Sequence, residues 1–478
     1  MQTGKPRAAL LASPGMGHLI PVLELGKRLL SHHGINITVF VVTGDASLSQ
    51  SQLRKVSEAA YDLLDVVLLS PVDVSGQIDK TTSILTQIAM MVHEALPSLQ
   101  SAILATEVPP IALVVDMFAT EAFSVAEELM MLKYVFITSN AWFLALTVHA
   151  PNLDNEVDQG DHINNQRPLL IPGCESVRFL DCFEQFLRQN EVYFRMGTEI
   201  STADGILVNT FHELEPQTLA ALNGTRKLGL VPNAPVYPIG PLVRPVQPDL
   251  RSDALSWLGM QPTGSVMYVS FGSGGTLSAE QTTELAWGLE KSQQRFIWVV
   301  RPPVENDSAA TVLKRNSSCT DFPDYLPEGF LNRTSKYGLV VPMWAPQAEI
   351  LSHPSIGGFL SHCGWNSSLE SILNSVPMIV WPLYAEQKMN ATVLAKHIGV
   401  AIRSELLPSQ GVIGRSEIEA MVRKIMVDKE GEAIRAKATM LKSCAEKALS
   451  KGGSSYNALA NVAKDFEIRM QSQNAKAD

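Results

Sequence analysis

The sequence predicts an α/β protein that contains two doubly wound, parallel-sheet domains in series. Short apolar segments rich in β-branched residues alternate with amphipathic helical segments along most of the chain. These apolar segments are continuous rather than alternating, which is typical of parallel strands covered by helices on both faces. The length of 478 residues exceeds one domain of ordinary size, and hydrophobic residues make up 46%, enough for two cores.

The predicted strands form two series, one in each half of the chain. In the first half they are Ala8–Ala12, Ile37–Val42, Val66–Leu69, Ile111–Val115, Tyr134–Ile137 and Ile206–Val208. In the second half they are Val266–Ser270, Phe296–Val300, Leu339–Val341, Gly358–Ser361 and Pro377–Trp381. Helical segments between the strands of each series favour a doubly wound fold in each half.

A proline-rich stretch over residues 240–248 marks the boundary, because prolines favour a stiff, extended connector. We therefore expect an N-terminal domain over 1–243, a linker over 244–252 and a C-terminal domain over 253–460. Residues 461–478 are expected to form a C-terminal helix and tail that pack back on the N-terminal domain.

Two local features are predicted in the second half. The stretch 302–327 is polar, punctuated by prolines and without periodicity, so we expect a surface loop, either a lid or a decoration. Ser416 followed by Glu419 forms a capping box, which predicts that a helix begins there, just before the apolar Ile418.

Composition excludes several classes of partner. The net charge of −10 speaks against nucleic acid and anionic membranes, since polyanion binders need a basic face. The five cysteines are odd in number and without C-x-x-C spacing, which favours reduced thiols in the cytoplasm. We expect neither a signal peptide nor a membrane-spanning segment, because no apolar run is long enough.

The segment from Trp344 to Gln387 contains the pattern of a phosphate-binding turn. Residues 357–361 read as a buried strand, residues 362–367 as a tight turn, and residues 368–373 as the start of a helix. Strand, glycine turn and helix start together aim free backbone N–H groups and the positive end of the helix dipole at a phosphate.

Single residues of this turn fit a nucleotide. Gly364 allows the backbone to approach a diphosphate closely, and His362, Asn366 and Ser367 can donate hydrogen bonds to it. Glu370 lies one helical turn beyond Asn366 and can accept from both ribose hydroxyls. A second glycine-rich turn, residues 270–275, follows a strand and can bring Ser273 to the diphosphate; alone such a loop is a weak signal.

The segment 344–387 resembles the 44-residue signature of plant secondary-product glycosyltransferases, members of family 1 with the GT-B fold. The resemblance extends from Gly15–His18 to the C-terminal helices and is closest to the subgroup that glucosylates monolignols and hydroquinone. It implies two Rossmann-like domains that face each other across a cleft. It further implies that residues 1–243 bind the acceptor and residues 253–460 bind a UDP-sugar.

The resemblance also carries donor contacts onto this chain. Trp344 would stack on uracil, with Ala345 and Gln347 at the edge of the base. Glu386, where Asp is more usual, and Gln387 would face the sugar hydroxyls, and Gln387 favours glucose over galactose. The residues so expected in the donor site are Thr138, Ser273, Trp344, Ala345, Gln347, His362, Gly364, Trp365, Asn366, Ser367, Glu370, Tyr384, Glu386 and Gln387.

The first half offers a general base. His18 lies where the first helix begins, after the strand Ala8–Ala12, and Asp116 closes the strand Ile111–Val115. Both therefore lie at the carboxyl edge of a parallel sheet, where such sheets bind ligands. Asp116 alone reads more readily as a helix N-cap, but the resemblance pairs it with His18 as the acid that orients the base. Thr138 is implied near the donor sugar, or is a strand-end turn residue.

Together with these residues, the resemblance implies an inverting transfer of glucose from UDP-glucose to a hydroxyl of a small phenolic acceptor, giving a β-glucoside. No metal is expected, because no Asp-x-Asp motif follows a strand and helix dipoles can replace a cation. We expect a monomer with no nucleic-acid partner. The alternatives are a UDP-sugar epimerase, another GT-B enzyme, and a non-catalytic protein that binds UDP-sugars.

Overall fold

A computed structural model describes residues 5–44, 64–79, 82–153, 168–175, 177–224, 234–247, 250–304, 325–408 and 410–477. Most of the expected surface loop 302–327 lies outside the described residues, as do Cys319 and two positions of the expected linker 244–252. The chain divides into two compact units. One consists of Met1–Val243 with Glu446–Asp478, and the other of Arg244–Ala445.

The first unit is built on a seven-stranded sheet in the order β3-β2-β1-β4-β5-β6-β7, in which every pairing is parallel. Its strands are β1 (Arg7–Ala12), β2 (Asn36–Val41), β3 (Asp65–Leu68), β4 (Ala112–Asp116), β5 (Leu132–Ile137), β6 (Gly205–Val208) and β7 (Val236–Pro238). Its helices are α1 (Met16–His33), η1 (Ser75–Gln77), α3 (Ile84–Leu104), η2 (Met117–Ala122), α4 (Phe123–Glu128), α5 (Ala141–Leu153), η3 (Phe179–Asp181), α7 (Glu184–Leu187), α8 (Glu191–Ile200), α9 (Pro216–Gly224) and α18 (Ser454–Ala477).

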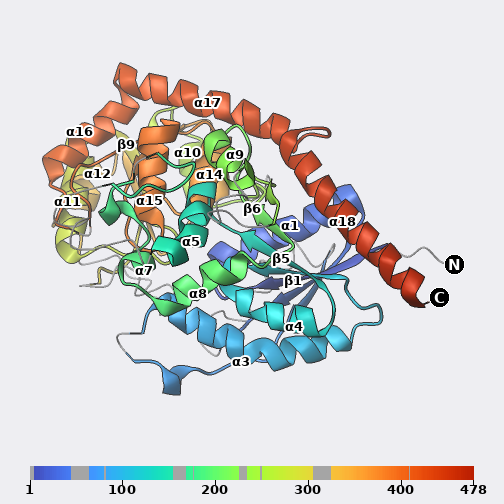
Figure 1. Ribbon diagram of the computed structural model, residues 1–478. Coiled ribbons are helices and arrows are strands. Elements are labelled where there is room, and N and C mark those ends of the chain that lie inside the picture. The colour runs from blue at the N-terminus through green and yellow to red at the C-terminus, as the bar shows by residue number, and fades with distance from the viewer. Residues whose placement is uncertain are drawn as a thin grey trace. The chain divides into compact units, whose positions relative to one another are not determined.

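Both faces of this sheet are covered, as the continuous apolar strands require. Ala8, Leu10 and Ala12 of β1 point to one face, where they share a buried cluster with α1 and α18. Figure 1 shows α3 and α4 along the opposite side of β1. The first sheet is thus a doubly wound α/β layer structure.

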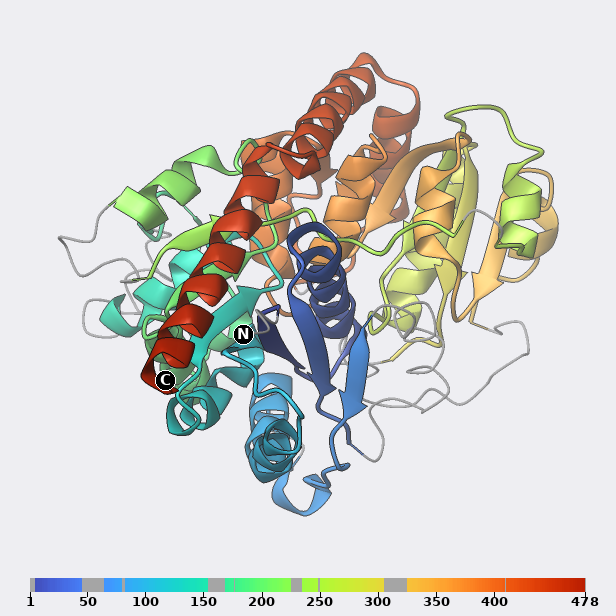
Figure 2. The ribbon, with the colours of Figure 1, turned by 90° about the vertical axis from the view of Figure 1, so that its right-hand side faces the viewer.

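The C-terminal helix α18 is part of the first unit. It packs on α1 and β7 (Figure 2). Asp465 accepts hydrogen bonds from the hydroxyls of Tyr134, at 2.9 Å, and Tyr237, at 3.2 Å. Phe466 meets the Tyr134 ring edge-on, with 5.2 Å between ring centroids. The sequence assigns residues 446–460 to the second domain, whereas the contacts group them with the first.

Asp465→Ala should destabilise the first unit, because two buried or half-buried phenol hydroxyls lose their acceptor. Hydrogen bonds to charged groups contribute about 1–3 kcal/mol each, and partial exposure of Asp465 places the expected loss at about 1–3 kcal/mol in total. Urea unfolding of the variant measures this loss. Glu467→Ala, on an exposed position of the same helix, is the matched control, and an equal loss in both variants would contradict the assignment.

The second unit is built on a six-stranded sheet in the order β10-β9-β8-β11-β12-β13, again parallel throughout. Its strands are β8 (Val266–Ser270), β9 (Arg295–Val300), β10 (Gly338–Pro342), β11 (Ile356–Ser361), β12 (Met378–Val380) and β13 (Ala401–Arg403). Its helices are α10 (Asp253–Leu258), α11 (Ala279–Ser292), α12 (Phe330–Thr334), α13 (Gln347–Ser352), α14 (Trp365–Leu373), α15 (Gln387–Thr392), the π-helical η5 (Val393–Ile398) and α16 (Arg415–Met426). Helix α17 (Lys429–Leu449) carries the chain from the second unit into the first.

The predicted capping box is wrong. Helix α16 begins at Arg415, its N-cap is Gly414, and no side chain caps it, so Ser416 already lies inside the helix. The Arg415 backbone N–H donates instead to Glu284 of α11, at 2.6 Å, and the Arg415 guanidinium pairs with the same carboxylate. A neighbouring helix therefore satisfies the first turn of α16, and α11 lies beside α16 in Figure 1.

Each sheet has one point where the strand order reverses. In the first sheet the point lies between β1 and β4, and in the second it lies between β8 and β11. Ligands of open α/β sheets bind at the carboxyl ends of strands at such points. Among the described helices, none has both the length and the apolar character needed to cross a bilayer.

Candidate active site

His18 and Asp116 meet at the reversal point of the first sheet. His18 lies in the first turn of α1, directly after β1, and Asp116 is the last residue of β4. The distance from His18 Nδ1 to Asp116 Oδ2 is 2.8 Å. The Asp116 side chain is fully buried, whereas 18% of the His18 side chain is exposed. The structure thus brings together the two residues that the sequence pairs.

Asp116 also caps η2, the short helix that follows it. The same side chain therefore contacts both His18 and a helix N-terminus. Its Oδ1 accepts from the Phe118 backbone N–H at 3.0 Å, as an N-cap does. The same oxygen accepts from the Ser13 hydroxyl at 2.7 Å. With Oδ1 held in this way, Oδ2 is directed at His18. The sequence analysis did not identify Ser13, although a polar residue that ends a central strand is the signal that could have found it.

Thr138 and Phe118 complete the surroundings of the imidazole. Thr138 Oγ1 lies 3.1 Å from His18 Nδ1 and 3.5 Å from Asp116 Oδ2. Thr138 therefore contacts the His–Asp pair, a position that the expectation of a donor-sugar contact did not include. The Phe118 ring lies against the imidazole, with 4.8 Å between centroids. An aromatic ring beside the imidazole can provide an apolar wall for a flat ligand.

Two further aromatic residues of the first unit lie in its core. Phe143 and Phe183 are buried and meet edge to face, with 5.4 Å between centroids. Phe183 also contacts Tyr193 of α8. These rings stabilise the packing of α5 against α8.

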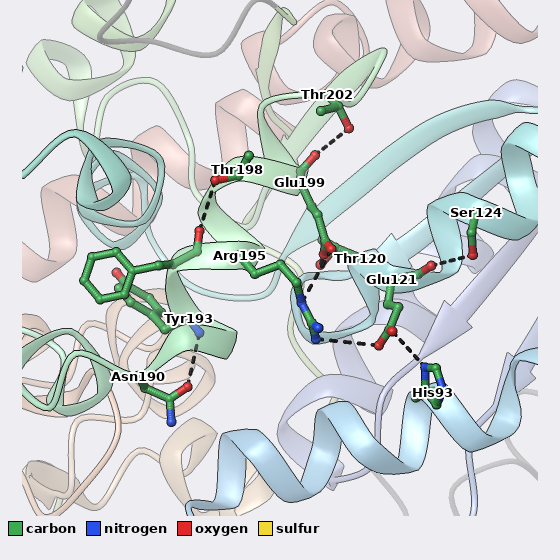
Figure 3. A network of polar contacts seen from close by, with 11 residues as sticks. His93, Thr120, Glu121, Ser124, Asn190, Tyr193, Arg195, Thr198, Glu199 and Thr202 are labelled. Carbon is green, nitrogen blue, oxygen red and sulfur yellow. Dashed lines mark hydrogen bonds and ion pairs between the residues drawn. The ribbon is translucent and has the colours of Figure 1, made fainter. Parts of the chain in front are cut away.

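A polar network outside this aromatic core holds η2, the helix that carries Phe118. His93 of α3 contacts Glu121 at 2.8 Å, and Glu121 lies 3.7 Å from Arg195 of α8. Thr120 donates to Glu199 at 2.7 Å. Figure 3 shows these side chains converging from α3, η2 and α8. Such surface ion pairs contribute little to stability individually, but together they fix η2 from two sides.

The contact between His18 and Asp116 determines which ring nitrogen of His18 carries the proton. A carboxylate can only accept, so Nδ1 of the neutral ring carries the proton and donates it to Asp116. Nε2 of the neutral ring then has the lone pair that can accept a proton from a substrate. When it does so, the buried carboxylate stabilises the imidazolium. The first unit therefore contains a histidine held in the tautomer of a general base.

In the second unit, two turns meet around the ring of His362. Gly272 follows β8 with a φ of 73°, and a Cβ there would lie 2.4 Å from His362 Nε2. A Cβ on Gly364, the N-cap of α14, would lie 2.6 Å from the same atom. Only glycine allows both turns to approach the imidazole so closely. The glycine-rich turn and the turn that starts α14 are thus packed on one side chain.

Burial determines the chemical state of the groups in this turn. It lowers the pKa of His362 to about 4, with a further contribution from the positive charge of Arg301, so this ring is neutral at physiological pH. Burial raises the pKa of the Cys363 thiol, which keeps it protonated and a poor nucleophile. Cys363 is therefore a small buried residue rather than a reactive one.

Three residues of α13 and α14 form a hydrogen-bonded group. The Gln347 amide donates to Ser367 Oγ at 2.8 Å and to Glu370 Oε2 at 2.7 Å. Burial raises the pKa of Glu370 to about 7. A carboxylate kept in a desolvated position is costly for folding and is ready to accept hydrogen bonds from a ligand.

Glu370→Gln should stabilise the unliganded protein in a pH-dependent way. The ordinary pKa of a glutamate is 4.5 and that of Glu370 is about 7, so the folded state binds more protons between these values and stability falls as pH rises through them. We expect the variant to be more stable than the wild type by about 1–3 kcal/mol near pH 8.5 and by little near pH 5. Denaturant unfolding at both pH values measures this, with Glu328→Gln on the surface as control. A difference that is constant with pH would contradict it.

The remaining predicted donor residues occupy distinct environments. Trp344 is 60% exposed, whereas the neighbouring Ala345 is buried. The Trp365 side chain is buried, with 2% exposed, so only its backbone can meet a ligand. Asn366 is the second residue of α14. An exposed indole three residues before the start of α13 is suited to stacking on a planar base.

Glu386 and Gln387 start helix α15. Gln387 is buried, and its Oε1 accepts from the backbone N–H groups of Leu383, at 2.9 Å, and Tyr384, at 3.1 Å. This orientation leaves the amide NH₂ as its donor group. Glu386 Oε1 accepts from Asn390 Nδ2 at 3.3 Å. Burial raises the pKa of the Tyr384 hydroxyl to about 12, so it stays protonated.

Ser273 is exposed at the tip of the glycine-rich turn. Its carbonyl accepts a hydrogen bond from the Arg301 guanidinium. The sequence analysis did not identify Arg301, although a charged residue directly after an apolar strand is the same signal that identified Asp116. Within the described residues, no group of three or more His, Cys, Asp and Glu side chains is arranged to hold a metal ion.

Comparison with known proteins identifies the family of this chain. The family described as UDP-glucoronosyl and UDP-glucosyl transferase matches residues 238–430. UDP-glycosyltransferase 72E1 of Arabidopsis thaliana is 49% identical over 475 residues, which cover 98% of this chain and 97% of the relative. Hydroquinone glucosyltransferase of Rauvolfia serpentina is 43% identical over 477 residues, covering 98% and 99%.

A solved structure has the same fold along the whole chain. TcCGT1 in complex with UDP superposes with a TM-score of 0.88 at 47% identity, covering 98% of this chain and 100% of that one. The parallel sheets, the signature segment and these likenesses agree. The chain belongs to the plant family 1 UDP-glycosyltransferases and has their GT-B fold.

Proposed function

We propose that the protein is an inverting, UDP-glucose-dependent O-glucosyltransferase for small phenolic acceptors, with His18 as the general base and Asp116 as the acid that orients it. The observation that carries the proposal is the 2.8 Å contact between His18 Nδ1 and the buried Asp116. This contact makes Nε2 the proton acceptor, and the Phe118 ring beside it favours an aromatic substrate.

The proposed reaction is a single displacement. The acceptor hydroxyl gives its proton to His18 Nε2, and its oxygen attacks the anomeric carbon of the donor. The bond from that carbon to the diphosphate breaks, and UDP leaves with the bonding electrons. Attack opposite the leaving group inverts the centre, so an α-linked donor gives a β-glucoside. General-base assistance of this kind contributes about 10²–10⁴ in rate.

The second unit is proposed to hold the donor. Backbone N–H groups at the start of α14 face the diphosphate, where the helix dipole favours negative charge. Trp344 stacks on uracil, with Ala345 and Gln347 at the base edge. Glu370 accepts from the ribose hydroxyls. The groups proposed to complete the phosphate site are His362, Gly364, Asn366, Ser367, Ser273 and the Trp365 backbone.

Glucose is proposed as the sugar because of the groups at α15. The Gln387 amide has both carbonyl lone pairs directed at the backbone, so its NH₂ is the group left to donate to sugar hydroxyls. Glu386 accepts from other hydroxyls, and Tyr384 lies at the margin of this site. Thr138 is proposed as a further contact of the donor sugar. A phenolic acceptor is favoured by the similarity to hydroquinone glucosyltransferase, with phenylpropanoids, flavonoids and coumarins in the same chemical class.

We propose that the enzyme works without a metal and as a monomer. We also propose that it lies in the cytoplasm, because an odd number of cysteines without C-x-x-C spacing suits a reducing compartment. The helix start at Trp365 would take over the charge-stabilising role of a cation. EDTA should therefore leave the transfer rate unchanged within about twofold. Re-addition of Mg²⁺ to the treated enzyme is the control, and a rate restored only by the metal would contradict the metal-free mechanism.

The function is tested by incubating the protein with UDP-glucose and a mixed panel of phenols. Mass spectrometry should find acceptors heavier by one hexose, and NMR should find the β-anomer. Free glucose or a rearranged nucleotide sugar as the product would instead indicate an epimerase or another GT-B enzyme. Binding of UDP-glucose without turnover of any phenol would indicate a non-catalytic protein.

A further inference from the structure

Arg301 joins the glycine-rich turn to the segment that precedes Trp344. It directly follows β9, at the carboxyl edge of the second sheet. Its Nε donates to the Met343 carbonyl at 3.2 Å, and its Nη1 donates to the Ser273 carbonyl. Met343 has a φ of 65° and precedes the exposed Trp344. One guanidinium thus fixes both the turn after β8 and the segment that presents the indole.

The charge of Arg301 lacks an acidic partner in the part of the chain that the structure describes. Both of its hydrogen bonds go to backbone carbonyls. The groups whose charges act on it are the phenols of Tyr268 and Tyr384, which are neutral at physiological pH. Burial lowers the pKa of Arg301, yet a guanidinium remains protonated in proteins. A partly desolvated cation without a counterion is unfavourable until an anion approaches.

A hollow beside this guanidinium contains a second polar atom in need of a partner. Gly272, Thr276, Leu277, Trp298 and Arg301 are among the residues that line it. Thr276 is 3% exposed, and among the described residues its hydroxyl has no hydrogen-bond partner. Buried hydroxyls are normally satisfied, so this one indicates a site that a polar ligand or water completes.

The charge of Arg301 reaches the proposed phosphate turn. It acts on His362, whose ring packs against Gly272 and Gly364. A carbonyl oxygen near a diphosphate would repel it, and the guanidinium engages the Ser273 carbonyl in a hydrogen bond. The residue therefore offsets negative charge in two ways, as a cation and as a partner for that carbonyl.

We propose that Arg301 is a donor-binding residue that recognises the diphosphate of the UDP-sugar. It positions the Ser273 turn and the Met343–Trp344 segment, and it supplies a positive charge beside the two turns that are proposed to bind the diphosphate. The inference rests on the proposed function, in which the second unit binds a UDP-sugar.

Calorimetric titration of the full chain with UDP and with uridine tests this role, because the two probes differ only in the diphosphate. Arg301→Met should weaken UDP binding about 10–100-fold and uridine binding less than about threefold. Arg301→Lys keeps the charge but not the fork of donors, so its affinity for UDP should lie between those of Arg301→Met and the wild type. Arg295→Met, at the opposite end of β9, is the matched control and should bind both probes like the wild type.

Equal losses for UDP and uridine would reduce Arg301 to a structural residue, and unchanged UDP binding would remove it from the donor site. Both results would overturn the inference while leaving the proposed function intact. Failure of the wild type to bind UDP would instead overturn the proposed function. If Arg301→Met does not fold, as judged by circular dichroism, Arg301→Gln decides the question, because it removes the charge but can retain a bond to one carbonyl.

Discussion

His18→Ala should lower kcat for phenol glucosylation about 10²–10⁴-fold while UDP binding stays within twofold of the wild type. The imidazole lies in the first unit and is proposed to act on the acceptor, whereas the groups proposed to bind the donor lie in the second. Removing the ring therefore removes the proton acceptor without changing the nucleotide site. Steady-state kinetics and calorimetry with UDP measure the two quantities separately.

The acidity of the acceptor provides a sharper test of the same variant. A nitrophenol that is already ionised at the assay pH needs no base, so its loss of rate in His18→Ala should be far smaller than that of a simple phenol. His212→Ala, which removes an exposed histidine of the same unit, is the control. An equal loss for both acceptors would mean that His18 positions the substrate rather than accepting its proton.

Asp116→Asn should lower kcat by at least about 10²-fold, and in hydrolase triads the comparable change costs about 10⁴. An amide NH₂ directed at His18 Nδ1 would force that nitrogen to accept, which places the ring proton on Nε2 and removes the base. The asparagine can still cap the Phe118 N–H through its oxygen, so the fold should be retained. Kinetics together with a thermal unfolding curve separate the two effects.

Ser13→Ala is the matched control for Asp116→Asn. It removes the 2.7 Å hydrogen bond to Oδ1 but leaves the contact between Oδ2 and His18. Its rate should fall only a few-fold, about the effect of one lost neutral hydrogen bond. A loss as large as that of Asp116→Asn would show that Asp116 matters through the packing of its surroundings rather than through the tautomer of His18.

The fold could be predicted from the sequence because parallel strands are apolar along their whole length. Strands such as Ile111–Val115 and Val266–Ser270 were therefore predicted. The edge strands β7 and β13, which have three residues each, were not predicted. The start of α16 was predicted wrongly because a contact with Glu284, distant in sequence, satisfies its first turn. Such contacts between helices leave no local signal.

The part of the candidate site that could be predicted consists of residues whose type and place at a strand end both belong to a motif. His18 and Asp116 follow adjacent strands of one sheet, so their meeting follows from topology. The contact of Thr138 with the same pair could also have been inferred from β5, which lies next to β4. The position of Arg301 directly after β9 could have been noticed, but its partners could not be predicted, because its hydrogen bonds go to backbone carbonyls that any residue type can offer.

The membership of α18 in the first unit has a consequence for synthesis of the protein. Leu459, Val462 and Phe466 cover part of the first sheet, yet the ribosome makes them only after residues 244–445. At about 5–20 residues per second, this interval lasts about 10–40 s. During that time the apolar residues of the first sheet that α18 covers lack this cover. The second unit is one continuous stretch of chain and waits for no later segment. Chaperone demand should therefore fall on the half that is translated first.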